Sequence, residues 1–322
     1  MAVLSEFEII RRFFTHSARG AVLGVGDDAA IVRARRGMDL VVSADMLVSG
    51  RHFFPDADPK LLGHKSLAVN LSDMAAMGAT PRWATLSIAL SRVDARWLKA
   101  FMGGFMRLAR RHRVDLVGGD TTRGPLTIAV QIIGEAPAGS ALRRDGARAG
   151  DDIWVSGALG AAALALAARR GRIRLAAGER RRLEQKLHAP VPRIALGAAL
   201  RGVARSAIDV SDGLVADLGH ICERSGVSAI IESARVPLPV IGKNNINQIV
   251  ITNSMLSGGD DYELAFSAGR ARRDAIARLA GRLRVKLTRI GKVIRRRKGP
   301  LVTVLDAAGR PVAVTRGGYE HF

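Results

Sequence analysis

Apolar residues follow two spacings along the first half of the chain, one typical of helices and the other of strands. After Asp58-Pro59 they recur every three or four residues up to Gly78, which predicts a helix with proline at its first position. A second helix is predicted after Asp94, where apolar residues between 97 and 108 share one face. Short β-branched runs predict strands at residues 40–43, 83–90, 114–117 and 126–133. The alternation of strands and helices predicts an α/β (α+β) fold.

A stretch rich in glycine, alanine and arginine at residues 137–150 interrupts this pattern. We place a domain boundary there, with a first domain at 1–137 and a second at 138–322. In the second domain the pattern predicts strands at 153–156 and 208–210, and helices after Gly157, at 179–187, at 192–203 and after Gly213. A hairpin is predicted at the end, with strands at 301–305 and 312–315 around a turn at 307–310.

The composition is typical of a globular protein. Of the 322 residues, 48% are hydrophobic and 25% are charged, a balance that disordered chains do not have. The longest apolar runs, such as residues 161–168, reach about half of the roughly 20 residues that a membrane helix needs. Glu6 and Glu8 argue against a secretory signal, and the single cysteine, Cys222, excludes an intrachain disulfide. We therefore expect a cytoplasmic protein that does not bind membranes.

The net charge of +21 raises the question of nucleic-acid binding. Aromatic residues make up only 4% of the chain, and the arginine-rich runs at 33–36, 180–182 and 295–298 fall in predicted loops or exposed helical stretches. A recognition module would interleave basic and aromatic residues on one face. We interpret the charge as a solvated surface that also attracts anionic nucleotides. A basic nucleic-acid-binding protein stays open as a remote alternative.

Aspartates recur in one local context, at strand ends or in turns that contain glycine. The groups are Gly26-Asp27-Asp28, Ser43-Ala44-Asp45, Gly118-Gly119-Asp120, Asp209-Val210-Ser211-Asp212-Gly213 and Ser257-Gly258-Gly259-Asp260-Asp261, with Asp73 in a helix. Short carboxylates on rigid turns suit Mg²⁺, and neighbouring glycines let the backbone approach a phosphate. A single Asp-Gly pair is more often a plain turn, but five such groups among only 29 acidic residues favour a common purpose. The sequence predicts a magnesium-dependent, ATP-using phosphotransferase centred on Gly26-Asp27-Asp28 and Gly118-Gly119-Asp120.

Other motifs for nucleotide or hydrolytic chemistry do not fit. Residues 24–29 match the loose Gly-x-Gly-x-x-Ala dinucleotide pattern, but two acids in that turn would repel a pyrophosphate. The sequence contains no P-loop, no protein-kinase His-Arg-Asp or Asp-Phe-Gly signature, no His-Glu-x-x-His zinc pattern and no Gly-x-Ser-x-Gly elbow.

Read in order, the motifs resemble those of the thiamine-monophosphate kinases, within the aminoimidazole-ribonucleotide-synthetase-like superfamily. The matching segments are Gly24–Ala29, Asp45 with Gly50 and His52-Phe53, Lys65–Ala79, Gly118–Thr122, Asp209–Leu214, Ser257–Leu264 and the terminal Gly318-Tyr319-Glu320-His321-Phe322. They extend over nearly the whole chain. The long block at residues 65–79 and the terminal Gly-Tyr-x-His-Phe are the most specific of them.

The resemblance implies transfer of the ATP γ-phosphate to thiamine monophosphate. It implies that Asp28, Ser43, Asp45, Asp73, Asp120, Asp209 and Asp212, with the backbone of Ala44, hold several Mg²⁺ ions. By the same resemblance Gly119, Asp120, Arg144 and Ser211 contact ATP, and His52, Asp260 and Tyr319 border the thiamine monophosphate. No separate catalytic base is implied, and Asp45 and Asp120 are expected to matter most.

The resemblance also implies an assembly. The first domain would be a mixed sheet with helices that pairs with its twin in a homodimer through a β-barrel, and the second an α/β sandwich that completes the active site. Three residues depart from the family pattern: Ala44 replaces a common threonine, Asp260 a more usual glutamate, and Arg316 a common aromatic residue.

Relatives in the same superfamily remain alternatives. A selenide-water dikinase would carry a reactive N-terminal cysteine, whereas Cys222 lies in a helical pattern. The hydrogenase-maturation relative ends in a functional cysteine, and this chain ends in His321-Phe322. An aminoimidazole ribonucleotide synthetase shares the aspartates but is not expected to carry the terminal motif.

Overall fold

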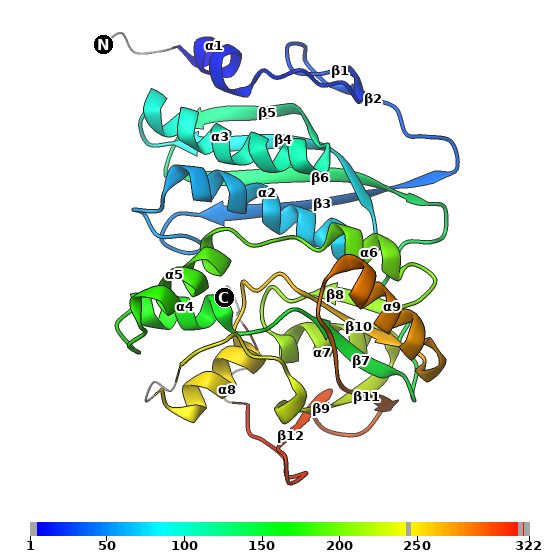
Figure 1. Cartoon of the computed structure of the whole chain (residues 1–322). Helices are drawn as coiled ribbons and strands as arrows, with labels where there is room; N and C mark the ends of the chain where they lie inside the picture. Colours follow the sequence, from blue (N-terminus) through cyan, green and yellow to red (C-terminus); the bar gives the residue numbers. More distant parts are fainter. Residues whose placement is uncertain (1–4, 243–245, 315–317, 319–322) are drawn as a thin grey trace. The chain divides into compact units, whose positions relative to one another are not determined.

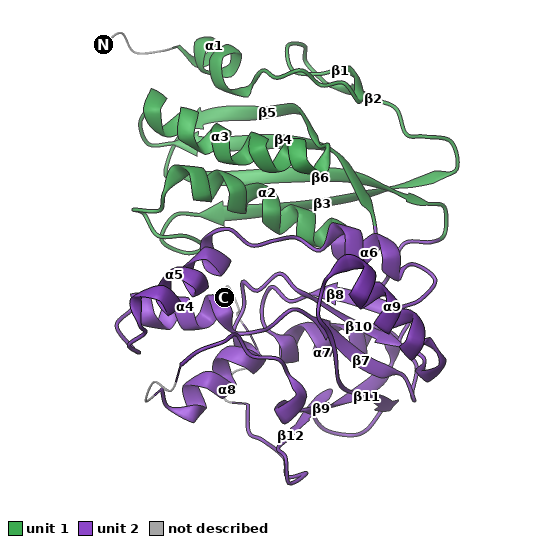
Figure 2. Cartoon of the chain, in the orientation of Figure 1, with its two compact units in different colours: residues 1–74, 79–139 green, residues 75–78, 140–322 purple. Residues whose placement is uncertain are grey.

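The computed structural model describes residues 5–242, 246–314 and 318 (Figure 1). The chain splits into two compact units, residues 1–74 with 79–139 and residues 75–78 with 140–322 (Figure 2). The boundary predicted after residue 137 lies next to the end of unit 1 at residue 139.

Residues 75–78, which the sequence placed in the first domain, group with unit 2 instead. Helix α6 (Ile194–Leu200) approaches them so closely that a Cβ on Gly197 would overlap the carbonyl oxygen of Ala75. The Arg201 side chain also donates to the carbonyl oxygen of Gly78. The grouping of residues 75–78 with unit 2 depends on contacts with residues more than a hundred positions away. The spacing of apolar residues along the sequence cannot reveal such contacts.

Unit 1 is built on a four-stranded sheet in the order β3-β6-β4-β5. The strands are β3 (Met38–Val48), β4 (Thr80–Leu90), β5 (Asp115–Arg123) and β6 (Thr127–Pro137), and helices α2 (Pro59–Ala76) and α3 (Ala95–His112) cover one face (Figure 1). The helices begin as the sequence predicts, because Asp58 and Asp94 each accept hydrogen bonds from backbone N–H groups of the first turn. Ile128, Val130 and Ile132 of β6 are buried on this face.

All four strands of this sheet are longer than predicted, and two of them, β3 and β5, carry candidate site residues. β3 runs to Val48, so Asp45 lies within the strand and not at its end. β5 runs through Gly118, Gly119 and Asp120, so the predicted loop is wrong. Gly119 is required there because a Cβ would overlap the carbonyl oxygen of Leu86 on the neighbouring strand.

The N-terminal segment of unit 1 is attached to this sheet by two hydrogen bonds. It contains α1 (Glu6–Ile9), the π-helical turn η1 (Ile10–Phe14), β1 (Ala21–Leu23) and β2 (Ile31–Val32). Gly20 N–H donates to Asp115 Oδ2 at 2.6 Å, and Trp83 Nε1 donates to the Gly20 carbonyl oxygen at 2.9 Å.

Helices α2 and α3 cross at two glycines. A Cβ on Gly63 would overlap the carbonyl oxygen of Phe101, and a Cβ on Gly104 would overlap that of Lys60. The two backbones therefore approach more closely than any larger side chain would allow.

We expect Gly63→Ala and Gly104→Ala each to lower the free energy of unfolding by about 1–3 kcal/mol, the usual cost of overpacking. Urea unfolding monitored by circular dichroism measures this. Gly103 is the matched control, because it is exposed and has open space around its Cβ position. Gly103→Ala should instead raise the free energy of unfolding by about 0.5–1 kcal/mol. Similar effects at positions 103 and 104 would contradict the close crossing.

Unit 2 is built on a six-stranded sheet in the order β12-β9-β11-β7-β10-β8. The strands are β7 (Asp152–Ser156), β8 (Ser206–Asp209), β9 (Val227–Glu232), β10 (Leu264–Ala268), β11 (Leu287–Arg295) and β12 (Val302–Leu305). β12 pairs parallel to β9, and the other neighbours pair antiparallel. The helices are α4 (Ala161–Arg169), α5 (Ala177–His188), α6, α7 (Leu214–Ser225), α8 (Gln248–Ser257) and α9 (Arg273–Leu283), with short 3₁₀ turns η2 (Ser233–Arg235) and η3 (Arg270–Arg272). The mixed sheets and helices confirm the predicted α/β class.

The C-terminal hairpin is confirmed only in part. Its first strand is β12, and the turn closes through a bond from Asp306 N–H to the Arg310 carbonyl oxygen. The return is a single bridge between Leu305 and Pro311, flanked by a hydrogen bond from Val312 N–H to the Val304 carbonyl oxygen at 2.9 Å. Thr315, the end of the predicted second strand, lies outside the described residues.

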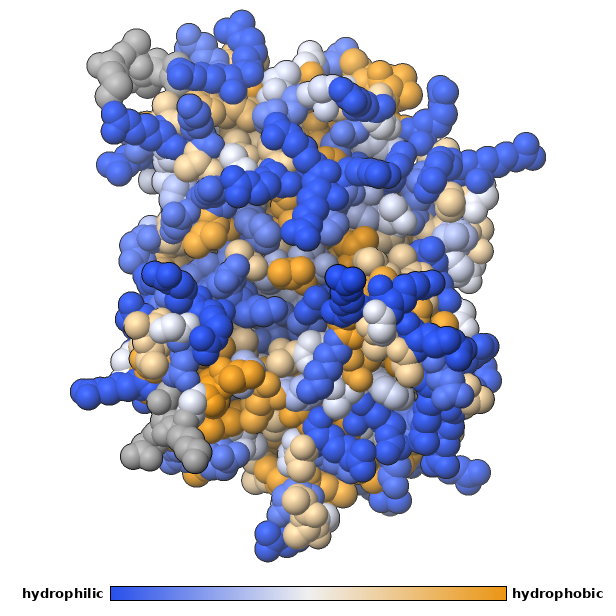
Figure 3. Space-filling view, viewed as in Figure 1, coloured by the Kyte–Doolittle hydropathy of each residue, from blue (hydrophilic) through white to orange (hydrophobic). Residues whose placement is uncertain are grey.

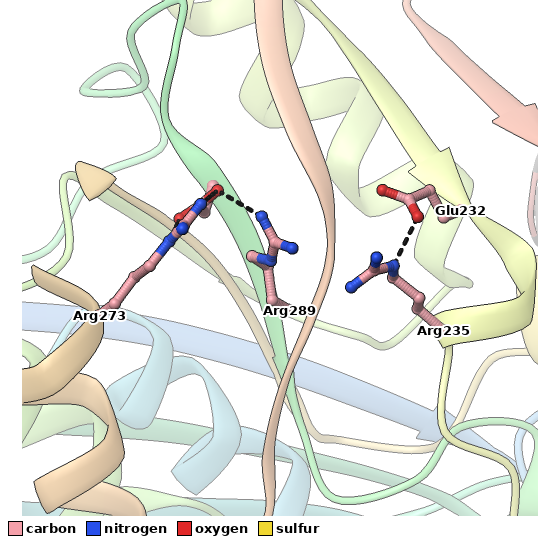
Figure 4. Close-up of polar contacts among 5 residues, drawn as sticks. Glu232, Arg235, Arg273 and Arg289 are labelled. Atoms are coloured by element: carbon pink, nitrogen blue, oxygen red, sulfur yellow. Dashed lines mark hydrogen bonds and ion pairs between the residues drawn. The ribbon is translucent and has the colours of Figure 1, made fainter. Parts of the chain in front are cut away.

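Two neighbouring buried aspartates in unit 2, Asp151 and Asp152, are paired with arginines. Asp152 on β7 accepts from Arg273 Nε at 2.6 Å and from Arg289 Nη1 at 3.4 Å, which ties α9 and β11 to β7 (Figure 4). The hydrogen bonds from Arg273 lower the pKa of Asp152, so this carboxylate stays ionised at neutral pH. A second pair in the same figure, Glu232 with Arg235, lies on the surface.

Hydrophilic side chains cover most of the face drawn in Figure 3, between separate apolar areas. The arginine-rich runs at 180–182 and 295–298 are exposed, one on α5 and one at and after the end of β11. Among the helices of the described residues, none has the length and apolarity to cross a membrane. The cytoplasmic location stays a prediction.

Candidate active site

In unit 2 the loop after β8 and the loop before β10 are joined by backbone hydrogen bonds. Val210 N–H donates to the Glu263 carbonyl oxygen at 2.8 Å, and Tyr262 N–H donates back to Val210 at 2.9 Å. Beyond the strands, Asp260 N–H donates to the Ser211 carbonyl oxygen at 2.8 Å. The structure thus brings the predicted nucleotide residue Ser211 next to the predicted substrate residue Asp260.

Glycines make this close approach feasible. A Cβ on Gly259 would overlap the Ser211 carbonyl oxygen, and a Cβ on Gly213 would lie 2.7 Å from the carbonyl carbon of Ser257. Gly213 also has φ +124°, a conformation that side chains rarely adopt. The glycines that suggested phosphate turns in the sequence serve here to pack one loop against the other.

Asp260 lies in a strained backbone segment. Its φ is +67° and that of Tyr262 is +50°, both in the left-handed region that favours glycine. The Tyr262 hydroxyl donates to Asp260 Oδ1 at 3.0 Å, so the ring orients this carboxylate. Such strain persists only where surrounding contacts hold the segment, and it concentrates at functional sites.

The neighbouring acids hold the segment in place. Asp261 is buried and accepts from Gly160 N–H, at the start of α4, at 2.6 Å. Glu263 accepts from Arg193 Nε at 2.6 Å and from Ser156 Oγ at 2.5 Å. Asp261 and Glu263 are therefore structural, although they stand in the same acidic run as Asp260.

Burial raises the pKa of Asp261 to about 8, with Glu263 and Asp260 adding to the effect of desolvation. The folded-state pKa lies above the unfolded value of 3.8. The stability that this group contributes is therefore fully present below the unfolded pKa and is lost as the pH rises through about 8.

We expect Asp261→Asn, which does not titrate, to gain stability relative to the unchanged protein as the pH rises from about 5 to about 8. Thermal unfolding at several pH values measures the difference in Tm. Asp274→Asn, at an exposed position at the start of α9, is the control and should show no such trend. A constant difference in Tm across this range would contradict the raised pKa.

Asp217 is a residue of this region that the sequence analysis missed. It is buried in the first turn of α7, and its Oδ2 accepts from the N–H groups of Ser211, Asp212 and Gly213 at 3.1, 3.2 and 3.1 Å. Burial, followed by the charges of Asp209 and Asp212, raises its pKa, whereas the hydrogen bonds from the Asp212 and Gly213 amides lower the pKa and favour the carboxylate. An acid four residues after a Ser-Asp-Gly turn was the available signal. Because the Ser211 N–H already has a partner, its hydroxyl is the group with which it can contact a nucleotide.

The other predicted residues of unit 2 differ in their surroundings. Asp209 is buried at the end of β8, and Arg144 is exposed, with its carbonyl oxygen accepting from Ser225 Oγ at 2.7 Å. Gly318 lies against the loop after β8, since a Cβ there would lie 3.1 Å from the Asp212 carbonyl oxygen. Tyr319 and Arg316 lie outside the described residues.

In unit 1 three predicted metal ligands share the helix-covered face of the sheet. Ser43 Oγ donates to Asp73 Oδ2 on α2 at 2.6 Å. Asp45 stands two residues along the strand from Ser43 and therefore points to the same side. Ala44 points to the opposite side, and its side chain is exposed.

Asp45 and Asp120 are not brought together within this sheet. β3 and β5 are its two edges, so three strand spacings, roughly 14 Å, separate them. The register places Asp45 in one row with Val130, Leu86 and Gly119, whereas Asp120 lies in the next row, beside Ser87. Successive rows point to opposite faces of a sheet. Strand order is a tertiary property, and the sequence did not reveal this separation.

Asp28 and His52 lie in loops of unit 1. Asp28 is exposed, and its N–H donates to Asp27 Oδ1 at 2.9 Å. His52 follows β3, and its Nδ1 accepts from Val48 N–H at 2.9 Å. A backbone N–H can only donate, so the neutral ring carries its proton on Nε2.

The predicted metal ligands offer oxygen atoms, the type of ligand that a hard cation prefers. Ser43, Asp45 and Asp73 in unit 1, and Asp209 and Asp212 in unit 2, offer hydroxyl and carboxylate oxygens, which suit Mg²⁺ better than softer metals. Across residues 5–242, 246–314 and 318, no three His, Cys, Asp or Glu side chains stand close enough together to hold a metal ion.

Comparison with known proteins gives consistent matches over the whole chain. Family models for the AIR synthase related protein match at residues 26–136 (N-terminal domain) and 148–303 (C-terminal domain). The thiamine-monophosphate kinase of Salmonella typhimurium is 42% identical over 98% of both chains. A crystal structure of the thiamine-monophosphate kinase of Stenotrophomonas maltophilia K279a is 45% identical, with a TM-score of 0.85 over 94% of this chain and 96% of that one. A solved structure of AaThiL complexed with AMPPCP and TMP is 29% identical, with a TM-score of 0.76 over 98% and 97%.

Proposed function

Because this chain belongs to the thiamine-monophosphate kinase family, we propose that it transfers the γ-phosphate of ATP to thiamine monophosphate, forming thiamine diphosphate and ADP. The observation that carries the proposal is the backbone hydrogen bond between Asp260 and Ser211, which joins the loop of the proposed acceptor contact Asp260 to the loop of the proposed nucleotide contact Ser211. The relative solved with AMPPCP and TMP supports the same pair of substrates.

The reaction needs no general base from this chain. The attacking atom is a phosphate oxygen of thiamine monophosphate, which is already anionic near neutral pH. Catalysis therefore rests on positioning two anionic substrates and stabilising charge on the transferring phosphoryl group. When bound, Mg²⁺ would supply the neutralising charge on the phosphate oxygens. We propose Asp28, Ser43, Asp45, Asp73 and Asp120 in unit 1, the Ala44 carbonyl oxygen, and Asp209 and Asp212 in unit 2 as its ligands.

Two residues of different chemistry are proposed to bind thiamine monophosphate, a hydrogen-bond donor and a negatively charged carboxylate. His52 can donate from Nε2 to a phosphate oxygen, because its Nδ1 already accepts from Val48. The Asp260 carboxylate, oriented by Tyr262, suits the positive charge of the thiazolium ring. We propose that ATP is contacted by Gly119, Arg144 and Ser211. We propose that thiamine monophosphate is also contacted by Tyr319.

A coupled ADP-release assay tests the proposal. Thiamine monophosphate, free thiamine, selenide and the aminoimidazole ribonucleotide precursor are compared side by side with ATP and Mg²⁺. We expect ADP release with thiamine monophosphate and formation of thiamine diphosphate. Turnover with selenide or the ribonucleotide precursor alone would overturn the assignment in favour of another member of the superfamily.

We further propose that the chain works as a homodimer through the sheet of unit 1. Both edges of that sheet, β3 and β5, lack a partner strand among the described residues. Leu40, Val42 and Met46 on β3 are 48%, 55% and 59% exposed, on the face opposite the helices. Apolar side chains in such a row indicate a surface that another protein covers. A second copy that pairs along these edges would close the sheets into the expected barrel.

We expect Met46→Asp to shift the protein from dimer to monomer, because a charge would be buried in the apolar interface. Sedimentation velocity measures the shift. Val93→Asp, at an exposed apolar position outside the sheet, is the control and should leave the mass unchanged. A Met46→Asp variant that still sediments as a dimer would contradict this interface.

A further inference from the structure

One carboxylate oxygen in unit 2 holds three consecutive backbone amides. Asp217 Oδ2 accepts from Ser211, Asp212 and Gly213, within 3.1–3.2 Å in each case. The side chain is 2% exposed, so water does not compete for these bonds. A single side chain therefore holds all three amides of the turn between β8 and α7.

The same turn is held from its other side by the loop that carries Asp260. The carbonyl group of Ser211 and the N–H of Asp212 belong to one peptide unit. Its carbonyl oxygen accepts from Asp260 N–H at 2.8 Å, and its N–H donates to Asp217 Oδ2 at 3.2 Å. This peptide plane thus lies between Asp217 and Asp260, with a hydrogen bond at each end.

Asp217 is well placed to act as a fixed anchor. It lies in the first turn of α7, and its own N–H donates to the Gly213 carbonyl oxygen at 3.0 Å. The following residues of the helix, Leu218, Ile221 and Cys222, are buried in the core of unit 2. A carboxylate on a helix fixed by its core is a rigid reference point for a loop.

We propose that Asp217 is a positioning residue that sets the spacing between the nucleotide-binding loop (residues 209–213) and the acceptor-binding loop (residues 257–263). The inference rests on the proposed function of these loops and adds a residue that contacts neither substrate. Loss of the carboxylate frees the Ser211–Asp212 peptide to rotate. This rotation changes the positions, relative to one another, of the Ser211 hydroxyl, the Asp212 carboxylate and Asp260.

The proposal predicts a defect shared by both substrates. A residue that touches only the nucleotide loop would change ATP binding alone. Because the peptide plane is also bonded to Asp260, Asp217 should affect ATP and thiamine monophosphate together. Outer contacts that orient ligating groups typically change affinity or activity by about 10–100-fold.

The test compares Asp217→Asn and Asp217→Ala with the control Glu223→Gln, at an exposed position on the same helix. Asparagine keeps one neutral acceptor oxygen, whereas alanine leaves three amides without a partner. Affinity for AMPPCP is measured by calorimetry, and KM for thiamine monophosphate and kcat by ADP release, all well below each variant's Tm. We expect Asp217→Ala to lose about 10-fold or more in both AMPPCP affinity and kcat/KM for thiamine monophosphate. Asp217→Asn should be intermediate, and Glu223→Gln unchanged.

A lower Tm with unchanged AMPPCP affinity and unchanged KM would overturn the proposal, because it would make the role of Asp217 purely structural. If the alanine variant does not fold, hydrogen exchange on the unchanged protein decides. The amides of Ser211, Asp212 and Gly213 should exchange slowly, because each donates to Asp217 Oδ2. Rapid exchange of these amides would overturn the proposal. If the unchanged protein has no activity on thiamine monophosphate, the proposed function is rejected. The hydrogen-exchange and AMPPCP measurements still test the positioning role of Asp217, because neither depends on that activity.

Discussion

Replacing Asp45 or Asp120 by asparagine is expected to lower kcat for thiamine monophosphate by about 10²-fold or more, the usual loss when one electrostatic group of a catalytic site is removed. Neither residue acts as a base in the proposed reaction, so the effect comes from weaker neutralisation of phosphate charge. Steady-state ADP release at saturating Mg²⁺ measures it. Asp39→Asn is the control on β3, where the asparagine can still accept from Gly139 N–H. Near-normal turnover in both variants would reject the metal-binding role.

The separation of these two aspartates allows a second readout. Asp45 and Asp120 lie on opposite edge strands of one sheet, in rows that point to opposite faces, so the sheet of one chain does not bring them together. We therefore predict that each site of the proposed homodimer uses Asp45 of one subunit and the partner subunit's Asp120. Each variant alone then has a defect in both sites. A mixed dimer of Asp45→Asn with Asp120→Asn has one site with both aspartates intact, and should recover about half of the unchanged activity. Co-expression with two different tags isolates the mixed dimer. Failure to recover activity in a mixed dimer of confirmed mass would show that each site draws both aspartates from one chain.

Replacing Arg193 by methionine is expected to lower the free energy of unfolding by about 3–5 kcal/mol, because it leaves the buried Glu263 carboxylate without its positively charged partner. The Arg193 and Glu263 side chains are 17% and 5% exposed, and Arg193 Nε donates to Glu263 Oε2 at 2.6 Å. Glu263 also ends the segment that holds Asp260 in its strained conformation. Urea unfolding measures the loss, and KM for thiamine monophosphate should rise because the acceptor-binding loop is loosened.

Two further variants separate burial of charge from loss of packing. Arg193→Met combined with Glu263→Gln removes both charges, and should recover a large part of the stability that the single variant loses. Arg180→Met breaks a surface pair with Glu184, in which Arg180 is 63% exposed, and should cost less than about 1 kcal/mol. If the double variant is no more stable than the single one, packing and not the unpaired charge accounts for the effect.

The sequence by itself determined the fold class and the main helices. Asp58 and Asp94 begin α2 and α3 because a cap is a local interaction between residues two or three positions apart. The sequence also predicted the residues of the candidate site, because their motifs resemble one family in their order along the chain, and these assignments stay predictions. The two-domain arrangement followed from composition, with the exception of residues 75–78.

Only the tertiary structure decided how these residues are grouped. Gly119 looked like part of a loop, but a strand at that point needs it to pass the Leu86 carbonyl oxygen. Asp260 and Asp261 are neighbours in sequence, yet one is oriented by Tyr262 and the other is buried against α4. Asp217 carried no motif role, and its importance depends on three amides that a helix brings within reach. The physical reason is common to all of these cases. Strand order, close backbone approach and the partners of buried charges depend on residues distant in sequence, whereas periodicity and capping depend on near neighbours.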